Sequence, residues 1–459
     1  MSPFCPAYPR PRKSRVSGLM MFFSARRSWM DALYERSYQM QMGEVHLPGI
    51  DMYMVNEPAL VRRVMTDEAS AFPKSRELGE ALEPLLGESI FTTNGAQWQR
   101  QRRMMEPAFA QARLNVAFPV MRDATQDLLA RLAARPDGAE QDLEIEMTHV
   151  TADIIFRTIF SVPMEGADAH RVFAAFARYQ EMAPRLMLPA LFGMRWLVLP
   201  WDRWRSRRAA AEIRGLLEQL VRPRFDANRS GQPHATTDIL SSFLDARDEA
   251  GQPFGFDELV DQVAMLFLAG HETSASALTW ATYLVAKSPE IQERMAAEVR
   301  QQLGGRQPEY TDMKSLTLTW NVFRETLRLF PPVGFISRQS TDACPMRDKQ
   351  VPQGASIVVS PWLIQRHRGL WQRPDEFDPD RYADDESRDS LRQAYLPFGM
   401  GPRVCMGAAF ALQEAALILS SLVGQYRLEP VAGHVPLPVG RLTIRSANGV
   451  RLKLHRRRA

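Results

Sequence analysis

A glycine-rich segment that carries one of the three cysteines most constrains the fold of this chain. The segment FGMGPRVCMG runs from Phe398 to Gly407 and leads directly into the apolar segment AAFALQEAALILSSLV. Gly399, Gly401 and Gly407 permit backbone angles and close approaches that other residues forbid. We therefore expect a tight loop that aims backbone N–H groups at the Cys405 sulfur, just ahead of a buried helix. Those donors and the positive end of the helix favour a thiolate, which is a strong metal ligand.

The other cysteines indicate a protein of a reducing compartment. Cys5 and Cys344 are too scattered to form a disulfide framework with Cys405, and no C-x-x-C pair or histidine cluster predicts zinc. The apolar run GLMMFF at 18–23 is shorter than the roughly 20 residues of a membrane span and the about 7–15 residues of an export signal. We therefore expect a cytoplasmic protein without a transmembrane anchor.

The excess positive charge lies at the two ends of the chain. The formal net charge is +4, and much of the excess comes from Arg10, Arg12, Lys13 and Arg15 and from residues 456–458. Aromatic residues are not interleaved with these basic residues, as they are in proteins that bind single-stranded nucleic acid. We therefore expect both ends to be solvated tails and expect no nucleic-acid partner.

Helical periodicity dominates the rest of the sequence. Apolar residues recur at three- and four-residue spacing in segments 113–135, 142–162, 206–227, 256–286, 289–303, 314–330 and 406–424. Ser288-Pro289-Glu290 predicts a helix start, with an N-cap serine followed by a first-turn proline and acid. Short alternating runs at 50–55 and 355–360 predict strands.

These elements predict one large, mainly helical domain with a small β region, over residues 25–459. Residues 1–24 form a basic, proline-rich extension, and no repeat or low-complexity linker divides the remainder. The apolar segment 186–204 is broken by prolines and a glycine. Two interpretations of this segment stay open: a loop with short helices that covers the core, or a mobile lid, with or without contact to lipid.

Polar residues interrupt the longest expected helix, 256–286. The motif AGHETS places Glu272 and Thr273 in its middle, and polar residues at such a position need a reason. A mid-helix threonine can bond the carbonyl four residues earlier and hold water, and an acid beside it can relay protons. The alternative is an exposed polar stripe, and we expect His271 to be a bystander of that kind.

The ten residues from Phe398 to Gly407 resemble the haem-binding loop of the cytochrome P450 family, Phe-x-x-Gly-x-Arg-x-Cys-x-Gly. Phe398, Gly401, Arg403, Cys405 and Gly407 fill every fixed place, and four further motifs follow the family's order between residues 98 and 407. The resemblance implies a mainly α triangular fold with haem b between the long central helix and the cysteine-loop helix. Cys405 would be the axial thiolate, which pushes electron density to iron and favours O–O cleavage.

The same resemblance assigns roles within AGHETS. Glu272 and Thr273 match the acid–alcohol pair that delivers protons to oxygen during catalysis. Ala269 and Gly270 match the small residues that leave room for oxygen above the haem.

A structural network is implied by Glu325-Thr-Leu-Arg328. An acid and a base three residues apart face the same side of a helix, and on a surface such a pair would mean little. In the family an arginine downstream completes a buried network, and Arg381 in FDPDRY occupies the matching place. We expect this network to hold the loop under the haem rather than to act in catalysis.

The haem propionates would meet arginines from three parts of the chain. Trp98 and Arg102 lie four residues apart and match the pair that hydrogen-bonds one propionate. Arg338 in PPVGFISRQS matches the strand arginine that meets the other propionate. With Arg403 these arginines would surround two carboxylates, a role that suits their charge and their fork of donors.

The resemblance implies a haem-thiolate monooxygenase that uses O₂ and two externally supplied electrons. No flavin or ferredoxin sequence is fused to this chain, so we expect a separate ferredoxin and an NAD(P)H-dependent ferredoxin reductase, and a monomer. Candidate contacts for an acidic partner are Arg100, Arg103, Arg366 and Arg368. Two rivals stay open: a peroxide-driven or isomerase-type haem-thiolate enzyme, and a non-enzymatic haem sensor or carrier. The intact Glu272-Thr273 pair counts against both.

The substrate pocket is expected to be apolar. By position it should draw on Phe91, Met182, Leu186, Met187, Met265, Leu266, Val333 and Phe335. Such a lining indicates a lipophilic small molecule such as a fatty acid, a terpenoid or a steroid.

Overall fold

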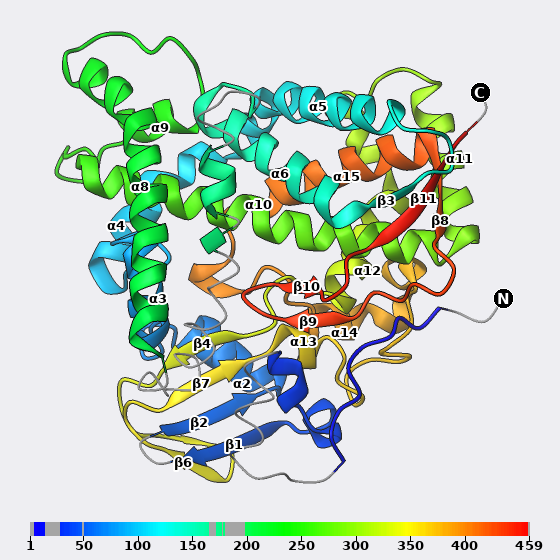
Figure 1. Ribbon diagram of the computed structural model, residues 1–459. Helices are drawn as coiled ribbons and strands as arrows, with labels where there is room; N and C mark the ends of the chain where they lie inside the picture. The colour runs from blue at the N-terminus through cyan, green and yellow to red at the C-terminus, as the bar shows by residue number, and fades with distance from the viewer. Residues whose placement is uncertain are drawn as a thin grey trace.

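The structure is a computed structural model, and it describes residues 4–13, 28–47, 50–164, 171–176, 178–179 and 198–457. Most of the described chain is helical, and the helices surround the long helix α10 (Figure 1). The helices are α2 Pro58–Arg62, α3 Arg76–Leu86, α4 Gly95–Met105, α5 Gln111–Ala133, α6 Leu143–Phe160, α8 Pro200–Arg229, α9 Ile239–Asp245, α10 Phe256–Ala286, α11 Pro289–Leu303, α12 Thr317–Leu329, α13 Pro361–Ile364, α14 Arg388–Ala394 and α15 Ala408–Gln425.

The predicted helices are present in the structure with small shifts at their ends. Helices α10 and α11 have the predicted bounds, whereas α8 begins six residues before the predicted 206, at Pro200. The start of α11 differs in one detail from the prediction. Pro289 is its first residue, but the hydroxyl of Ser288 makes no capping hydrogen bond.

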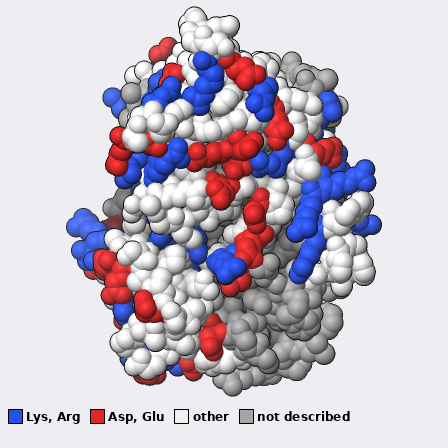
Figure 2. All heavy atoms as spheres, turned by 90° about the vertical axis from the view of Figure 1, so that its left-hand side faces the viewer, with Lys and Arg blue, Asp and Glu red and all other residues white. Residues whose placement is uncertain are grey.

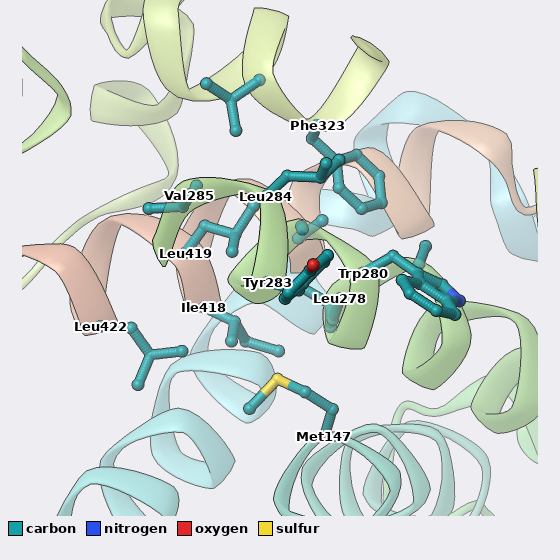
Figure 3. Packing of buried hydrophobic residues seen from close by; sticks show 14 of the residues in the cluster. Met147, Leu278, Trp280, Tyr283, Leu284, Val285, Phe323, Ile418, Leu419 and Leu422 are labelled. Atoms are coloured by element: carbon teal, nitrogen blue, oxygen red, sulfur yellow. The ribbon is translucent and has the colours of Figure 1, made fainter. Parts of the chain in front are cut away.

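The core forms where α10 meets α6, α12 and α15. Helix α10 is apolar on nearly all sides and is buried along most of its length, as expected for a central helix. Figure 3 shows Leu278, Tyr283 and Leu284 of α10, with Ile418 of α15 and Met147 of α6 below them. Within the described chain, α15 is the one helix long and apolar enough to cross a membrane, and most of it is buried in this core.

A four-stranded sheet lies beside the helices, at the bottom of Figure 1. Its strands run in the order β1 Met42–Leu47, β2 Ile50–Val55, β7 Ser356–Val359 and β4 Ile336–Gln339. The β2–β7 pairing is parallel and joins Met52 to Ser356, so distant parts of the chain meet here. The other strands are β3 Glu140–Asp142, β5 Cys344–Met346, β6 Lys349–Val351, β8 Tyr426–Pro430, β9 Pro438–Gly440, β10 Ile444–Ser446 and β11 Arg451–Arg456.

The prediction of solvated tails is wrong for part of both basic ends, because Arg12 and Arg457 pack against the domain, whereas Arg10, Lys13 and Arg456 are exposed. Near the start, the amide of Phe377 donates to the Phe4 carbonyl at 2.9 Å. Arg12 donates its amide to Leu33. At the other end, Arg457 binds both carboxylate oxygens of Glu293 at 2.8 Å. Aromatic contacts and internal acids hold these segments, which composition alone did not reveal.

Two sequence predictions fall partly outside the described residues. The predicted boundary between residues 24 and 25 lies outside the described residues, and so does most of the segment 186–204. The last residues of that segment, from Pro200, form the start of α8.

Figure 2 shows one face of the molecule, on which Lys and Arg are interspersed with Asp and Glu. A mixed surface of this kind is typical of a solvated face rather than of a field of one sign.

Candidate active site

The cysteine loop is closed by its own backbone. The amide of Cys405 donates to the Phe398 carbonyl at 3.0 Å, and the amide of Val404 donates to the Gly401 carbonyl at 3.0 Å. Gly399 and Gly401 have φ angles of +70° and +71°. A Cβ atom on Gly401 would lie 2.1 Å from the Met65 carbonyl oxygen. Only glycine therefore fits at 401, and the loop has the tight form that its sequence predicts.

The Cys405 thiol lies three residues before α15 and keeps an exposed surface, although protein surrounds it closely. Burial raises the pKa of the thiol, while a hydrogen bond from the Gly407 amide and the charge of Arg102 lower it. The net direction of the shift is upward, because burial outweighs the hydrogen bond and the charge of Arg102. A metal ion would change this, because it deprotonates a thiol that coordinates it.

Arg102 lies beside the cysteine loop. Its guanidinium donates to the Val404 carbonyl at 2.8 Å and pairs with Glu106 at 3.0 Å. Arg102, Glu106, Cys405 and Met406 also line a surface hollow of about 530 Å³. Arg102 therefore already has partners within the chain, whereas the sequence analysis expected it to bind a haem propionate.

Three cationic side chains, Lys74, Arg338 and Arg403, form a cluster near the cysteine loop. Lys74 and Arg403 both contact the ring of Trp98, at 5.9 and 5.3 Å from its centroid. Lys74 and Arg338 are joined by a β-bridge. Burial and the charges of Arg403 and Arg338 lower the pKa of Lys74 to about 6, and burial followed by Arg403 lowers that of Arg338 to about 10.

The donors of this cluster are not all used. Backbone carbonyls accept from Lys74, Arg338 and Arg403, but the Nε atoms of Arg338 and Arg403 are buried without a partner. None of the three forms an ion pair within the described residues. A buried cation without an anion is costly, so this cluster fits a ligand that carries carboxylates.

Helix α10 opens to accessible space at Ala269, Gly270 and Thr273, although its neighbouring residues are buried. The Thr273 hydroxyl donates to the Ala269 carbonyl at 2.7 Å, and the helix continues without a break. Gly270 has a different reason to be small. A Cβ atom there would lie 2.8 Å from the side chain of Ile155 on α6, so this glycine permits the close packing of the two helices.

Glu272 is buried and held by partners that sequence analysis missed. The Thr443 hydroxyl donates to its carboxylate at 2.6 Å, and Arg445 lies 3.3 Å from it. His271 is buried rather than exposed: its Nδ1 lies 2.6 Å from the Phe267 carbonyl oxygen, and burial lowers its pKa. The alternative of an exposed polar stripe is therefore wrong for both residues.

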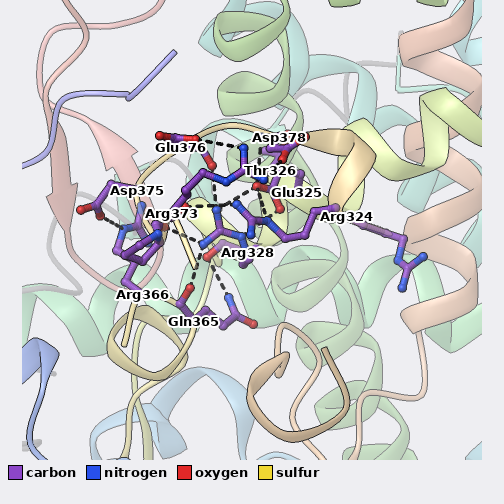
Figure 4. A network of polar contacts seen from close by, with 12 residues as sticks. Arg324, Glu325, Thr326, Arg328, Gln365, Arg366, Arg373, Asp375, Glu376 and Asp378 are labelled. Carbon is purple, nitrogen blue, oxygen red and sulfur yellow. Dashed lines mark hydrogen bonds and ion pairs between the residues drawn. The ribbon is translucent and has the colours of Figure 1, made fainter. Parts of the chain in front are cut away.

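Glu325, Arg328 and Arg381 meet in one fully buried network, of which Figure 4 labels Glu325 and Arg328. Arg328 binds both carboxylate oxygens of Glu325, at 2.8 and 2.9 Å, and Arg381 reaches the same carboxylate at 3.3 Å. The remaining guanidinium N–H groups of the two arginines donate to backbone carbonyls of residues 365–376. This network ties α12 to the long segment that precedes the cysteine loop.

Comparison with known proteins decides the family. The family model described as Cytochrome P450 matches residues 18–449. The chain belongs to the cytochrome P450 family. Its cofactor is haem, with Cys405 as the thiolate ligand of the iron, and it is a P450 monooxygenase.

Similar P450s support this assignment. The chain is 33% identical to cyclooctatin synthase of Streptomyces melanosporofaciens over 85% of its length and 83% of that protein. It is 31% identical to pentalenene oxygenase of Streptomyces avermitilis over 88% of its length and 87% of that protein. The crystal structure of the cytochrome P450DA heme domain matches with a TM-score of 0.80 and 25% identity, and covers 91% of this chain and 90% of that one. The predicted P450 fold is thus confirmed.

The residues of this P450 fit haem. The cations Lys74, Arg338 and Arg403, which form no ion pair within the described residues, could supply the donors that two propionates require, and Trp98 lies against two of them. Cys405 supplies the thiolate. Lys74 was missed by sequence analysis because only the fold brings it beside Arg338.

The predicted pocket residues have different surroundings. Phe91 and Val333 expose 43% and 39% of their surface, whereas Met265 and Leu266 are buried in the core. Phe335 packs against Trp29, with ring centroids 4.3 Å apart. Met182, Leu186 and Met187 lie outside the described residues.

One of the four arginines suggested for partner binding, Arg366, is wrongly assigned. Arg366 is fully buried and stacks on Trp362, 3.6 Å from the ring centroid. Arg100 pairs with Asp248 and Glu258 at 2.7 Å. Arg103 and Arg368 are exposed, and Arg103 lines the hollow beside Cys405.

Proposed function

We propose that this P450 hydroxylates a terpenoid-type lipophilic molecule. The observation that carries the proposal is the similarity to cyclooctatin synthase, cyclooctat-9-en-7-ol 5-monooxygenase and pentalenene oxygenase, three proteins whose names refer to small, mostly hydrocarbon compounds. The exposed apolar side chains of Phe91 and Val333 are compatible with such a substrate. Two electrons come from a separate ferredoxin and its NAD(P)H-dependent reductase. The protein acts as a cytoplasmic monomer, with residues 25–459 as its catalytic domain.

The chain's own residues hold the cofactor. When bound, the haem supplies the electron-transfer and oxygen chemistry of the reaction. Lys74, Arg338 and Arg403 bind its carboxylates and thereby orient it, while the Glu325 network holds the segment that leads to Cys405. Ala269 is small and accessible, which leaves this face of α10 open.

Proton delivery is the role of Glu272 and Thr273. The Thr273 hydroxyl, which donates to the Ala269 carbonyl, can turn to donate toward the haem side or to hold a water there. Glu272 lies next to it in the sequence and resupplies protons to this hydroxyl or water. The pair favours oxygen activation over an isomerase or sensor role, because neither of those needs delivered protons.

The substrate class is tested by spectral titration of the purified haem protein against lipophilic compounds. Terpenoids are expected to shift the haem absorption band more strongly than fatty acids or steroids of similar size. Conversion of the tightest ligand, with surrogate ferredoxin and reductase, should yield a hydroxylated product. Preferential binding and turnover of a fatty acid would overturn the terpenoid assignment.

The ligand and proton roles are tested by two variants. Cys405→Ser should lose the red-shifted carbon-monoxide band of the reduced protein, because a neutral hydroxyl replaces thiolate poorly. Thr273→Ala should still bind haem and substrate and consume NAD(P)H, while product per electron pair falls and hydrogen peroxide rises. Unchanged coupling in Thr273→Ala would show that this hydroxyl only bonds the Ala269 carbonyl.

A further inference from the structure

Arg445 of strand β10 lies between two carboxylates from different helices. Its Nε atom is 3.3 Å from Glu272 of α10 and 3.5 Å from Glu144 of α6. Its Nη1 atom lies 3.3 Å from the hydroxyl of Thr148, one turn along α6 from Glu144. Because both oxygens lie within 3.5 Å of the same guanidinium nitrogen, they are no more than about 7 Å apart, a gap that one or two water molecules can bridge.

The two carboxylates differ in their access to solvent. The side chain of Glu272 exposes 6% of its surface, whereas that of Glu144 exposes 18%. Glu144 is also in the first turn of α6, directly after strand β3. The pair therefore spans the distance from the accessible start of α6 to the middle of α10, where Thr273 follows Glu272.

The charges around Glu144 suit a group that exchanges protons. Burial raises the pKa of Glu144, and the neighbouring acids Asp142 and Glu272 raise it further, whereas Arg445 and Arg441 lower it. These groups come from α6 and its cap, from α10, and from β10 and the turn before it. A carboxyl whose pKa moves toward neutral pH is a better proton donor at that pH.

We propose that Glu144 takes up protons from solvent and passes them, through a bridging water, to Glu272. The inference rests on the proposed role of Glu272 and Thr273. In the transfer, the Glu144 carboxylic acid loses its proton to the water, which gives one of its own to the Glu272 carboxylate. Glu272 then supplies Thr273, and Glu144 regains a proton from solvent. No electron moves, and one proton enters for each proton used.

Arg445 is a positioning residue in this scheme. An arginine stays protonated at any ordinary pH, so it does not carry the proton itself. Its contacts keep the Glu144 and Glu272 carboxylates side by side and oriented. A purely structural role would instead make Arg445 a clamp between β10, α6 and α10, and the experiments must separate the two roles.

The first experiment compares Glu144→Gln with Glu146→Gln in the haem-loaded protein. Glu146 is the matched control: it lies on the same helix, is buried and pairs with Arg131 and Arg135, away from Arg445. Glu144→Gln should lower product per electron pair by about tenfold, less than the loss of a direct acid catalyst, and should raise the solvent deuterium isotope effect. Glu146→Gln should change neither quantity.

A second measurement does not depend on activity. The protonated carboxyl of Glu144 absorbs in the infrared, and its band should disappear in Glu144→Gln. Because the charge of Glu272 raises the Glu144 pKa, Glu272→Gln should shift the pH at which this band titrates downward. This test stays informative if Glu144→Gln folds poorly, since it is read on the Glu272→Gln protein. An unshifted titration would overturn the coupling.

Replacement of Arg445 separates positioning from clamping. Arg445→Met removes the charge and should lower coupling, which is the product formed per electron pair. Arg445→Lys keeps the charge, so it should retain most of that coupling even when the two variants have the same thermal stability. If coupling follows stability alone, or if Glu144→Gln behaves like Glu146→Gln, the relay is wrong. If Thr273→Ala also leaves coupling unchanged, the failure lies with the proposed role of the Glu272-Thr273 pair instead.

Discussion

Two clusters of basic side chains differ in whether the chain supplies their negative charge. Glu325 lies between Arg328 and Arg381, and the spare N–H groups of both arginines reach backbone carbonyls. The cluster of Lys74, Arg338 and Arg403 contains no acid within the described residues, and buried donors there stay unpaired. The first cluster is complete without a ligand, and the second is not.

This difference separates residues that hold the fold from residues that hold the cofactor. A buried ion pair is strongly destabilised when one partner is removed, because the other charge is left behind. A buried cation without a partner already carries that cost. Its replacement by an apolar residue should therefore stabilise the haem-free protein. Mutations in the two clusters should therefore have opposite effects on the free energy of unfolding.

The largest effect is expected in the complete cluster. Glu325→Ala leaves two buried arginines unpaired and should cost about 3–5 kcal/mol, so that little folded, haem-loaded protein is recovered. Asp380→Ala is the control, because Asp380 forms an exposed pair with Arg294 and its loss should cost less than about 1 kcal/mol. Chemical denaturation of both variants checks this. A well-folded Glu325→Ala protein would contradict the assignment.

A smaller effect, of opposite sign in the haem-free protein, is expected for Arg338→Met. Without haem, this variant should be as stable as the wild type or more stable. With haem, it loses charged hydrogen bonds of about 1.5–3 kcal/mol, which corresponds to haem dissociation about 10 to 100 times faster. Transfer of haem to an excess of apomyoglobin measures the rate. Arg306→Met, in an exposed pair with Asp312, should leave it unchanged.

The smallest expected effect is a change in the number of protons that the protein takes up from the buffer, or releases to it, when haem binds. The pKa of Lys74 is about 6 in the haem-free protein, so at pH 8 this amine is mostly neutral. Haem carboxylates beside it would raise that pKa, and the amine would then bind a proton. Titration calorimetry in two buffers should thus show that Lys74→Met releases about one more proton than wild type. Lys349, whose amine pairs with Glu44 and lies apart from this cluster, provides the control, and a similar change in Lys349→Met would refute the idea.

The sequence predicted those features that depend on local pattern. The bounds of α10 and α11 follow from apolar spacing and, for α11, from the proline at its start, and the loop around Cys405 follows from its glycines. The resemblance added Glu325, Arg328 and Arg381, which meet as expected. These signals lie within short windows of the chain.

Features that depend on distant pairing were missed or wrongly assigned. Lys74 meets Arg338 only through the sheet, and Thr443 and Arg445 reach Glu272 only because the β9–β10 hairpin folds onto α10. Arg366 was assigned to the surface because a sequence does not reveal that an arginine is stacked on a buried tryptophan.

The sheet has a consequence for how this protein is made in the cell. Strand β2 pairs with β7, and Met52 meets Ser356, so more than half of the chain must be synthesised before β2 gains this partner. Until then β2 presents an open edge, and such edges pair readily with other chains. Arg338 and Arg403 also emerge late, so the haem site is assembled near the end of translation. The yield of intact enzyme will therefore depend on keeping nascent chains apart, and on haem supply, at that late stage.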